Sequence, residues 1–292
     1  MSTERETAGA GDHGFAFLQQ ILPLHALSRA MHRLARSRQP LLRKAFVRSL
    51  LKSYPQIDLG EAAQPDPGAY ESFNAFFTRA LRPGARPVAS GVGEIACPVD
   101  GTVSQLGAIE SGSLVQAKGM SYTSAELLAD AGAAVRYAGG SFACLYLAPY
   151  NYHRIHMPVD GRLLATRYVP GTLFSVNAAT ARTIPNLFAR NERVVCEFET
   201  ALGPLALVLV GALFVGSIET VYAGEINPPP ARGSAVRDIA TGNGLQFGRG
   251  QELGRFNMGS TVVAVFGRGV RFADRLGPGA AVRLGQLLAR AQ

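Results

Sequence analysis

The sequence predicts an α+β protein in which a β-rich body follows basic amphipathic N-terminal helices. Apolar residues between positions 15 and 53 recur every three or four residues, as one face of a helix requires. From about residue 88 onward, short β-branched runs alternate with Gly, Pro and Asn, which is typical of strands joined by turns. The chain also has 33 Gly, 17 Pro and no Trp among its 292 residues, so we expect many turns.

The N-terminal region divides into a tail and a helical segment. Residues 1–14 begin with MSTERETAGAGD, which has no apolar stretch, so we expect a disordered tail there and no signal peptide. Residues 15–64 are expected to be helical over 15–53, with Pro23 and Pro40 dividing them into two or three helices.

Charge is concentrated in that helical segment. No acidic residue lies between His13 and Ile57, and the eight basic residues there equal the net charge of the whole chain, +8. These eight are Arg29, Arg33, Arg36, Arg38, Arg43, Lys44, Arg48 and Lys52. A basic amphipathic segment suits a surface of anionic lipid. A helical pair with a solvated basic face explains the pattern equally well, and no nucleic-acid motif accompanies the charge.

Residues 65–292 are expected to form one β-rich domain. A short helix is expected near 70–80 and another near 123–131, whereas the runs GTVSQLGAI, SLVQAKG, FACLYLA, GRLLATRYVPG, RVVCEFET and STVVAVF are expected to be strands. Residues 200–218 carry no charge and are long enough to span a bilayer. Because glycines and a Gly-Pro pair interrupt this stretch, two buried strands joined at a glycine are the better prediction.

The cysteines favour a reducing compartment. Cys97, Cys144 and Cys196 are far apart, odd in number and without CxxC spacing. This pattern argues against a disulfide framework or a structural zinc site, and it predicts three small buried side chains.

Three short motifs carry groups that can do chemistry. His153 and His156 form an HxxH pair in YNYHRIHMP, Asp100 lies in CPVDGTVSQLG, and Ser260 lies in GRFNMGSTVVAVF. Each has an ordinary alternative: a partial metal site or packing for the histidines, and a turn for the other two. Together they form a candidate Ser–His–Asp set, for which a hydrolase is the generic interpretation, although the GxSxG elbow of one large hydrolase class is absent.

Eight longer segments, in their order along the chain, resemble the phosphatidylserine decarboxylase family in its bacterial type I form. They are PVDGTVSQLG, QAKGMSYT, YHRIHMP, YVPGTLFSVN, PNLFARNERV, VGSIETV, GQELGRF and FNMGSTVV, and the similarity runs from about residue 15 to about residue 270. The family usually has Leu where this chain has Met258. That change conserves volume and leaves the Gly-Ser bond intact.

The resemblance implies a self-cleaving proenzyme. The hydroxyl of Ser260 would attack the carbonyl of Gly259, giving a β chain, 1–259, and an α chain, 260–292, in which Ser260 becomes a covalent pyruvoyl cofactor that forms a Schiff base with the substrate. By the same resemblance, His156 would be the base for cleavage, oriented by Asp100, and His153 the acid that reprotonates carbon. No metal is implied. The alternative is a Ser–His–Asp hydrolase without self-cleavage.

The resemblance also implies the substrate and the place of action. Phosphatidylserine would be converted to phosphatidylethanolamine and CO2 by a protein bound peripherally at the cytoplasmic side of the cell membrane. Lys118, in QAKG, would meet the phosphate or the carboxylate of the substrate, although an exposed turn lysine explains it equally well. The α and β chains would form a heterodimer, and a homodimer of these is compatible with the family. No nucleic-acid partner is expected.

Overall fold

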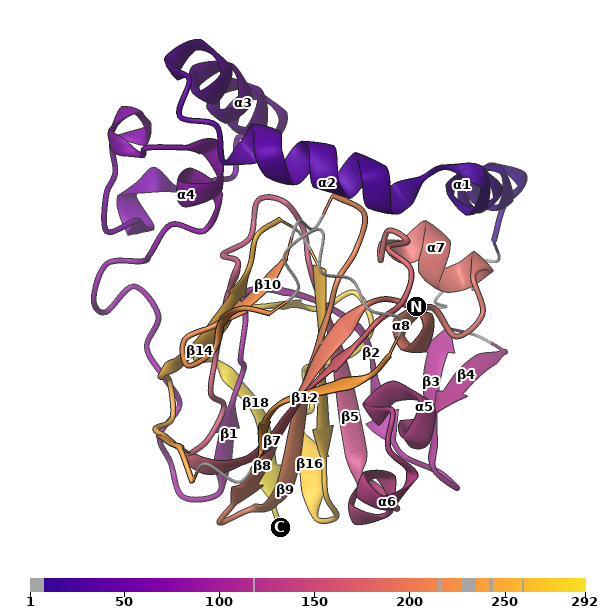
Figure 1. The fold of residues 1–292 in the computed structure, drawn as a ribbon. Helices are drawn as coiled ribbons and strands as arrows, with labels where there is room; N and C mark the ends of the chain where they lie inside the picture. The colour runs from indigo at the N-terminus through magenta and orange to yellow at the C-terminus, as the bar shows by residue number, and fades with distance from the viewer. Residues whose placement is uncertain (1–7, 118, 215–216, 227–234, 242–243, 259) are drawn as a thin grey trace.

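The computed structural model describes residues 8–117, 119–214, 217–226, 235–241, 244–258 and 260–292. Three N-terminal helices lie across one end of a β-rich body, and the C-terminus lies at the opposite end (Figure 1). The α+β prediction is therefore confirmed. Lys118 and Gly259, two of the predicted site residues, lie outside the described residues.

The N-terminal segment forms three helices, as the prolines predict: α1 (Ala10–Ile21), α2 (Leu24–Ala35) and α3 (Pro40–Ser53). Helix α1 begins inside the segment expected to be a disordered tail. Its start is fixed on the body, because Asp12 accepts a hydrogen bond from Arg182 at 3.1 Å. Further along α1, the Gln19 amide exchanges two hydrogen bonds with Ser175.

Helix α2 is attached to the body by polar groups. Glu225 is hydrogen-bonded to His32 at 2.8 Å and forms an ion pair with Arg36 at 3.2 Å, and the Ser28 hydroxyl accepts a hydrogen bond from the Phe214 backbone. Burial raises the pKa of Glu225, but its hydrogen bonds to His32 and Ser217 and the nearby Arg36 outweigh that effect and lower the pKa to about 2.

A large antiparallel sheet forms the centre of the body. Its strand order is β12-β7-β8-β9-β15-β5-β2-β17, and β13 also pairs with β7. The bounds are β2 (Gly101–Ala108), β5 (Ser141–Leu147), β7 (Gly161–Val169), β8 (Arg193–Thr200), β9 (Gly203–Val210), β12 (Arg237–Thr241), β13 (Gln246–Phe247), β15 (Ser260–Phe266) and β17 (Ala281–Val282). The six predicted strand runs fall on β2, β3, β5, β7, β8 and β15.

Apolar residues cover both faces of this sheet. Along β15, Val262 and Ala264 point into one hydrophobic core and Val263 and Val265 into the other, as the two-residue period of a strand requires. β15 is fully buried because it has a paired strand on each side and a core on each face. The first residue of this buried strand is Ser260.

Smaller elements complete the body. A second sheet has the order β11-β10-β14-β6, a third β1-β18-β16, and β3 pairs with β4. Their bounds are β1 (Glu94–Ala96), β3 (Ser113–Ala117), β4 (Met120–Thr123), β6 (Arg154–His156), β10 (Ile218–Thr220), β11 (Gly224–Glu225), β14 (Glu252–Phe256), β16 (Val270–Phe272) and β18 (Leu287–Ala291). The short helices are α4 (Phe73–Phe77), α5 (Ser124–Leu128), α6 (Ala131–Ala134), α7 (Ala178–Thr183) and α8 (Leu187–Arg190), with 3-10 turns η1 (Leu59–Glu61), η2 (Pro67–Ala69) and η3 (Val135–Tyr137).

Of the two strands expected in the uncharged stretch 200–218, LALVLV and ALFV, the first is formed and the described residues of the second, Ala212–Phe214, are not a strand. β9 uses LALVLV, but Gly211–Phe214 form no strand: Gly211 hydrogen-bonds to Glu192 and Phe214 has a positive φ of 67°. Among the described residues, no helix has the length and hydropathy needed to cross a membrane. The three cysteines are buried and free, as predicted.

Candidate active site

Ser260 is held rigidly at the start of β15. It pairs with Leu147 of β5, and the next residue, Thr261, pairs with Tyr146 on one side and Val210 on the other. The Ser260 side chain is fully buried, and its Oγ has no hydrogen-bond partner among the described residues. The hydroxyl of Thr261 is likewise without a partner among the described residues, so the missing bond leaves Ser260 Oγ available to react but does not by itself identify it as a nucleophile.

The backbone before Ser260 is strained. Met258 has a φ of +111°, which costs a residue with a Cβ about 1–3 kcal/mol. The preceding residue, Asn257, is fixed by its side chain: it donates to Ser217 Oγ at 2.7 Å and accepts from Asn74 at 3.0 Å. The strained Met258 thus lies between a residue fixed by its side chain and a buried strand that begins at Ser260.

His153 lies buried against Phe77 of α4, with their ring centres 4.2 Å apart. Its Nδ1 lies 2.8 Å from the Asn151 carbonyl, which can only accept, so Nδ1 carries the proton in the neutral ring. Nε2 therefore holds a lone pair, and it has no hydrogen-bond partner among the described residues. Burial lowers the pKa of His153 to about 3, so this ring is neutral near pH 7.

His156, on β6, has both ring nitrogens engaged. Nδ1 donates to the Gly250 carbonyl at 2.7 Å, and Nε2 accepts from the Tyr152 hydroxyl at 3.1 Å. Burial also lowers the pKa of His156, although the bond to Gly250 and the Glu252 charge partly oppose that shift. The ring is held in the tautomer that a general base needs, with a lone pair on Nε2.

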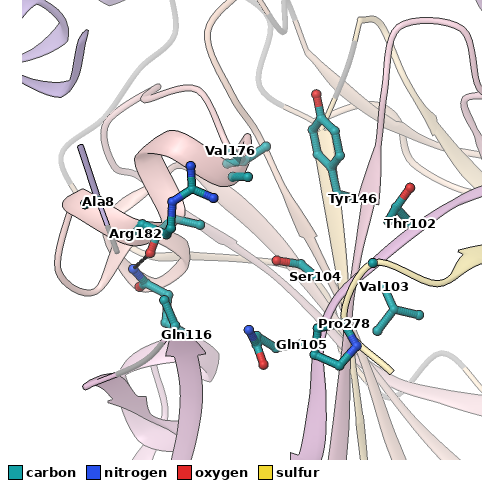
Figure 2. Close-up of a pocket in the computed structure, with 14 residues that line it drawn as sticks. Ala8, Thr102, Val103, Ser104, Gln105, Gln116, Tyr146, Val176, Arg182 and Pro278 are labelled. Atoms are coloured by element: carbon teal, nitrogen blue, oxygen red, sulfur yellow. Dashed lines mark hydrogen bonds between the residues drawn. The ribbon is translucent and has the colours of Figure 1, made fainter. Parts of the chain in front are cut away.

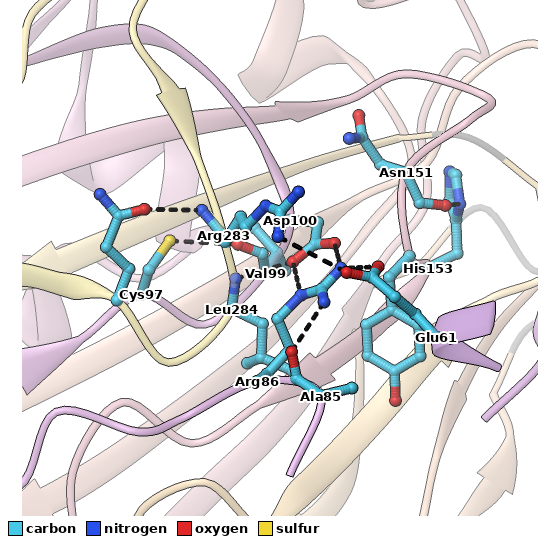
Figure 3. A network of polar contacts seen from close by, with 12 residues as sticks. Glu61, Ala85, Arg86, Cys97, Val99, Asp100, Asn151, His153, Arg283 and Leu284 are labelled. Carbon is cyan, nitrogen blue, oxygen red and sulfur yellow. Dashed lines mark hydrogen bonds and ion pairs between the residues drawn. The ribbon is translucent and has the colours of Figure 1, made fainter. Parts of the chain in front are cut away.

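Asp100 binds an arginine rather than a histidine (Figure 3). Its carboxylate accepts from Arg86 Nε at 3.0 Å and Arg86 NH2 at 2.7 Å, and the Leu284 backbone donates to it at 2.8 Å. The expected contact in which Asp100 orients His156 is therefore not formed, because Gly250 and Tyr152 occupy the histidine. Asp100 is instead linked to His156 through the backbone, since Pro98 accepts the amide hydrogen of His156.

Three cavities surround these residues. One of about 180 Å³ is apolar and lies between Leu50 of α3, Phe77 of α4 and Met258. A second, of about 270 Å³, is polar and has Asp100 in its wall. The third, of about 690 Å³, is lined by Tyr146 and Gln116 among others (Figure 2). Tyr146 is the strand partner of Thr261, so the third cavity lies on the sheet face opposite the Ser260 side chain.

Gln116, from the QAKG motif, serves the fold. Its amide donates to Ala181 and Ile184 and accepts from the Leu187 amide, so it joins β3 to helices α7 and α8. Its neighbour Lys118 is outside the described residues. Among the described residues, no three His, Cys, Asp or Glu side chains converge in a way that could hold a metal ion.

Sequence reasoning missed several of the groups that build the site. Arg86 lies in a proline-rich turn segment, and nothing in its local sequence pairs it with Asp100. Phe77 reads as one apolar residue of a short helix, and Asn257 as a turn residue. The strain at Met258 has no sequence signal at all, because a methionine rarely adopts positive φ.

The site combines a buried serine hydroxyl with no hydrogen-bond partner among the described residues, a strained residue two positions before it and two histidines whose pKa values are lowered by burial. These are the parts of a candidate catalytic centre. Family models match most of the chain: "Phosphatidylserine decarboxylase" over residues 73–290 and "PSD" over residues 15–55. The chain is thus an enzyme of the lyase class that is made as a proenzyme.

Curated relatives are similar in sequence to this chain along nearly its whole length. The chain is 51% identical over 273 residues to the phosphatidylserine decarboxylase proenzyme of Methylococcus capsulatus, covering 93% of this chain and 94% of the relative. It is 51% identical over 278 residues to that of Pseudomonas putida, covering 94% and 96%. For that of a Shewanella species the identity is 52% over 277 residues, covering 93% and 94%. The chain belongs to the phosphatidylserine decarboxylase family.

Proposed function

We propose that this chain cleaves itself between Gly259 and Ser260, and that the product decarboxylates phosphatidylserine to phosphatidylethanolamine and CO2 at a membrane surface. Family membership supports the reaction. The observation that carries the self-cleavage is Ser260: a fully buried hydroxyl, without a hydrogen-bond partner among the described residues, at the start of a buried strand and two residues after the strained Met258.

In the cleavage step, Ser260 Oγ attacks the carbonyl carbon of Gly259 and an ester replaces the amide. β-Elimination then breaks the Cβ–Oγ bond, which releases residues 1–259 with a new carboxylate and leaves a dehydroalanine. Hydrolysis of that group expels ammonia and leaves the pyruvoyl group. Strain at Met258 raises the energy of the intact chain, and this favours the step that releases it. The two chains stay together because β15 keeps its pairing with β5 and β9.

His156 is proposed as the base that takes the Ser260 proton. A useful base has a pKa near the working pH, and the value of about 3 for His153 makes that ring a weak one. For His156 to act as this base, its Nε2 must give up the hydrogen bond from the Tyr152 hydroxyl and accept one from the Ser260 hydroxyl instead. Asp100 is proposed as a positioning residue, because its pairing with Arg86 fixes the segment whose Pro98 carbonyl holds the His156 backbone.

The surroundings of Ser260 fit a pyruvoyl group. The residue lies in an apolar core, where no described side chain competes for its oxygen. When formed, the group supplies a carbonyl that takes up the electrons left by CO2. His153 is proposed to hand a proton to the substrate carbon. Its Nε2 holds a lone pair and has no hydrogen-bond partner among the described residues, so it would have to take up that proton before passing it on.

The N-terminal helices are proposed to hold the protein peripherally at the cytoplasmic face of the cell membrane. Beyond the polar contacts that attach α1 and α2 to the body, large apolar side chains point outward: Phe17 is 62% exposed, Ile21 65% and Leu41 84%. Together with the eight basic residues they match an interface of anionic lipid. The apolar cavity between α3 and Met258 lies between these helices and Ser260, and is proposed to take acyl chain.

A denaturing gel tests the self-cleavage. The wild type should give a large chain and a small fragment of residues 260–292, whereas Ser260→Ala should give one chain of 30.9 kDa. Borohydride reduction in the presence of labelled phosphatidylserine should attach label to the small fragment alone. A single band for the wild type, with hydrolytic activity, would instead identify a serine hydrolase.

Vesicle binding tests the surface. Changing Ile21 and Leu41 together to Ser should weaken binding to phosphatidylserine vesicles about a hundredfold or more, because each buried Ile or Leu contributes about 1.5–3 kcal/mol. Val92→Ser is the matched control, since Val92 is fully exposed on the body. If the double variant binds vesicles as well as the wild type does, or if Val92→Ser loses as much binding as the double variant, helices α1 and α3 are not the membrane-binding surface.

A further inference from the structure

The polar cavity beside Asp100 contains an arginine that the fold does not use. This cavity, of about 270 Å³, lies between the turn that carries Arg86, the start of β2 and the segment around Tyr152. Figure 3 shows the polar network at its wall, with the Arg86–Asp100 pair in the middle. The unused residue, Arg79, follows helix α4 and lines the same cavity.

The acids of this cavity are all occupied. Asp100 is bound by Arg86, and Glu61 by Arg86 at 2.8 Å and Arg283 at 3.5 Å. The remaining acid, Asp58, is exposed and caps η1 by accepting from the Gly60 amide at 2.7 Å. The cavity lining carries three arginines and three acids, so the formal charges balance, but Arg79 has no carboxylate partner among the described residues.

Arg79 is also deeply buried. Its exposed fraction is 5%, it donates no side-chain hydrogen bond to a described residue, and Nε is enclosed without a partner. The guanidinium carbon lies 5.4 Å from the centre of the Phe76 ring, which is a weak contact for a cation so far from water. Burial lowers the pKa of Arg79, as expected for a charge without compensation. Proteins rarely bury a cation in this way unless it receives an anion.

The wall of the cavity lies two strands away from the backbone beside Ser260. Thr102, in its wall, pairs with Tyr146, and Tyr146 pairs with Thr261. Two strand spacings, about 10 Å, therefore separate that wall from the residue beside Ser260. Arg79 is also close enough to His153 for its charge to contribute to lowering that histidine's pKa.

We propose that Arg79 binds the phosphodiester of the lipid headgroup and so sets how the substrate lies relative to Ser260. This rests on the proposed decarboxylation of phosphatidylserine. The substrate has a second anion, its carboxylate, but a cation paired to that group would stabilise it before the reaction and oppose its conversion to neutral CO2. The phosphodiester keeps its charge throughout, so binding it helps the substrate and the transition state equally.

Steady-state kinetics on mixed micelles test this assignment. Arg79→Gln should raise KM for phosphatidylserine at least about tenfold with kcat little changed, the pattern of lost uniform binding. Arg79→Lys should recover part of that loss because it restores the charge. Arg82→Gln is the matched control: Arg82 is exposed three residues further along and does not line the cavity. An O-acyl serine, which keeps the amine and carboxylate but has no phosphate, should be used equally well by the wild type and Arg79→Gln.

The outcomes separate cleanly. A fall in kcat for both substrates in Arg79→Gln would place the carboxylate at Arg79 and overturn the proposal, as would an unchanged KM. If Arg79→Gln does not fold or self-cleave, inhibition by glycerophosphoethanolamine is compared between the wild type and Arg79→Lys. Weaker inhibition of the lysine variant supports the phosphodiester contact, and equal inhibition contradicts it. If the wild type cleaves itself but does not decarboxylate phosphatidylserine, that result contradicts the proposed function and not the role of Arg79 alone.

Discussion

Replacement of Asp100 by Asn tests what the buried Arg86–Asp100 pair contributes. Both side chains are 8% exposed, and removing one partner of such a pair typically costs 3–5 kcal/mol. Here Asn retains an oxygen that can accept from Leu284, and Arg86 keeps its second partner, Glu61. We therefore expect Asp100→Asn to lower the free energy of unfolding by about 2–3 kcal/mol. The variant loses charge-assisted hydrogen bonds, and the neutral hydrogen bonds that remain offset part of that loss.

Urea unfolding followed by circular dichroism measures this, with every variant made in a Ser260→Ala background so that each protein is one uncleaved chain. Asp274→Asn is the matched control, because the Asp274 side chain is 86% exposed and pairs with Arg271 on the surface. It should change the free energy of unfolding by less than about 0.5 kcal/mol. Equal values for the two variants would refute the assignment of Asp100 as a buried structural anion.

Self-cleavage of the same variants, with Ser260 restored, separates structure from chemistry. If Asp100 acts by fixing the segment beside His156, Arg86→Met should slow cleavage as much as Asp100→Asn does. If Asp100→Asn blocks cleavage while Arg86→Met permits it, then Asp100 contacts His156 in the cleaving state, in contrast to the geometry seen here.

Three further predictions concern the histidines, the strained segment and the attachment of α2. His156→Ala should remain uncleaved on a gel, whereas His153→Ala should cleave but lose at least about a hundredfold in decarboxylation, as expected for a missing proton donor; the opposite pattern would exchange their roles. Met258→Gly should slow cleavage about tenfold in a time course, because glycine accepts a φ of +111° without strain, and an unchanged rate would remove strain from the mechanism. Glu225 has its pKa lowered to about 2, so it stabilises the fold fully above its unfolded value near 4.5, and this contribution is lost as the pH falls through about 2. In Glu225→Gln, the melting temperature should therefore fall less steeply than in the wild type as the pH is lowered from about 4.5 to about 2. The same pH dependence in both proteins would contradict the contacts of Glu225 with His32 and Arg36.

The periodicity of the sequence predicted most of the elements because apolar spacing is set locally. The helices end where Pro23 and Pro40 require, and β15 follows from the β-branched run after Ser260. The stretch 200–218 was harder, because an apolar run does not reveal where pairing stops. There the backbone leaves the sheet after Val210, and Gly211 approaches the Glu192 carbonyl so closely that a Cβ would lie 3.1 Å from it.

The site was predicted only as a set of residue types. Ser260, His153 and His156 could be named from their motifs, but hydrogen-bond partners depend on chain segments far apart in sequence. Asp100 takes Arg86 and Leu284, which lie 14 and 184 residues away, and no local pattern reports that choice. The tautomers of the histidines depend likewise on the carbonyls of Asn151 and Gly250, and backbone carbonyls carry no sequence signal.

The burial of Ser260 bears on the order of events. Ser260 and His153 are both 0% exposed, so no headgroup can reach either of them in the uncleaved chain. Cleavage after Gly259 would free the new chain end, while Asn257 stays bound to Ser217 and Asn74. Met258 could then leave its strained conformation. The same sequence of steps that forms the pyruvoyl group would thus also release the chain end beside it, and β15 would keep that group in place through its two paired neighbours.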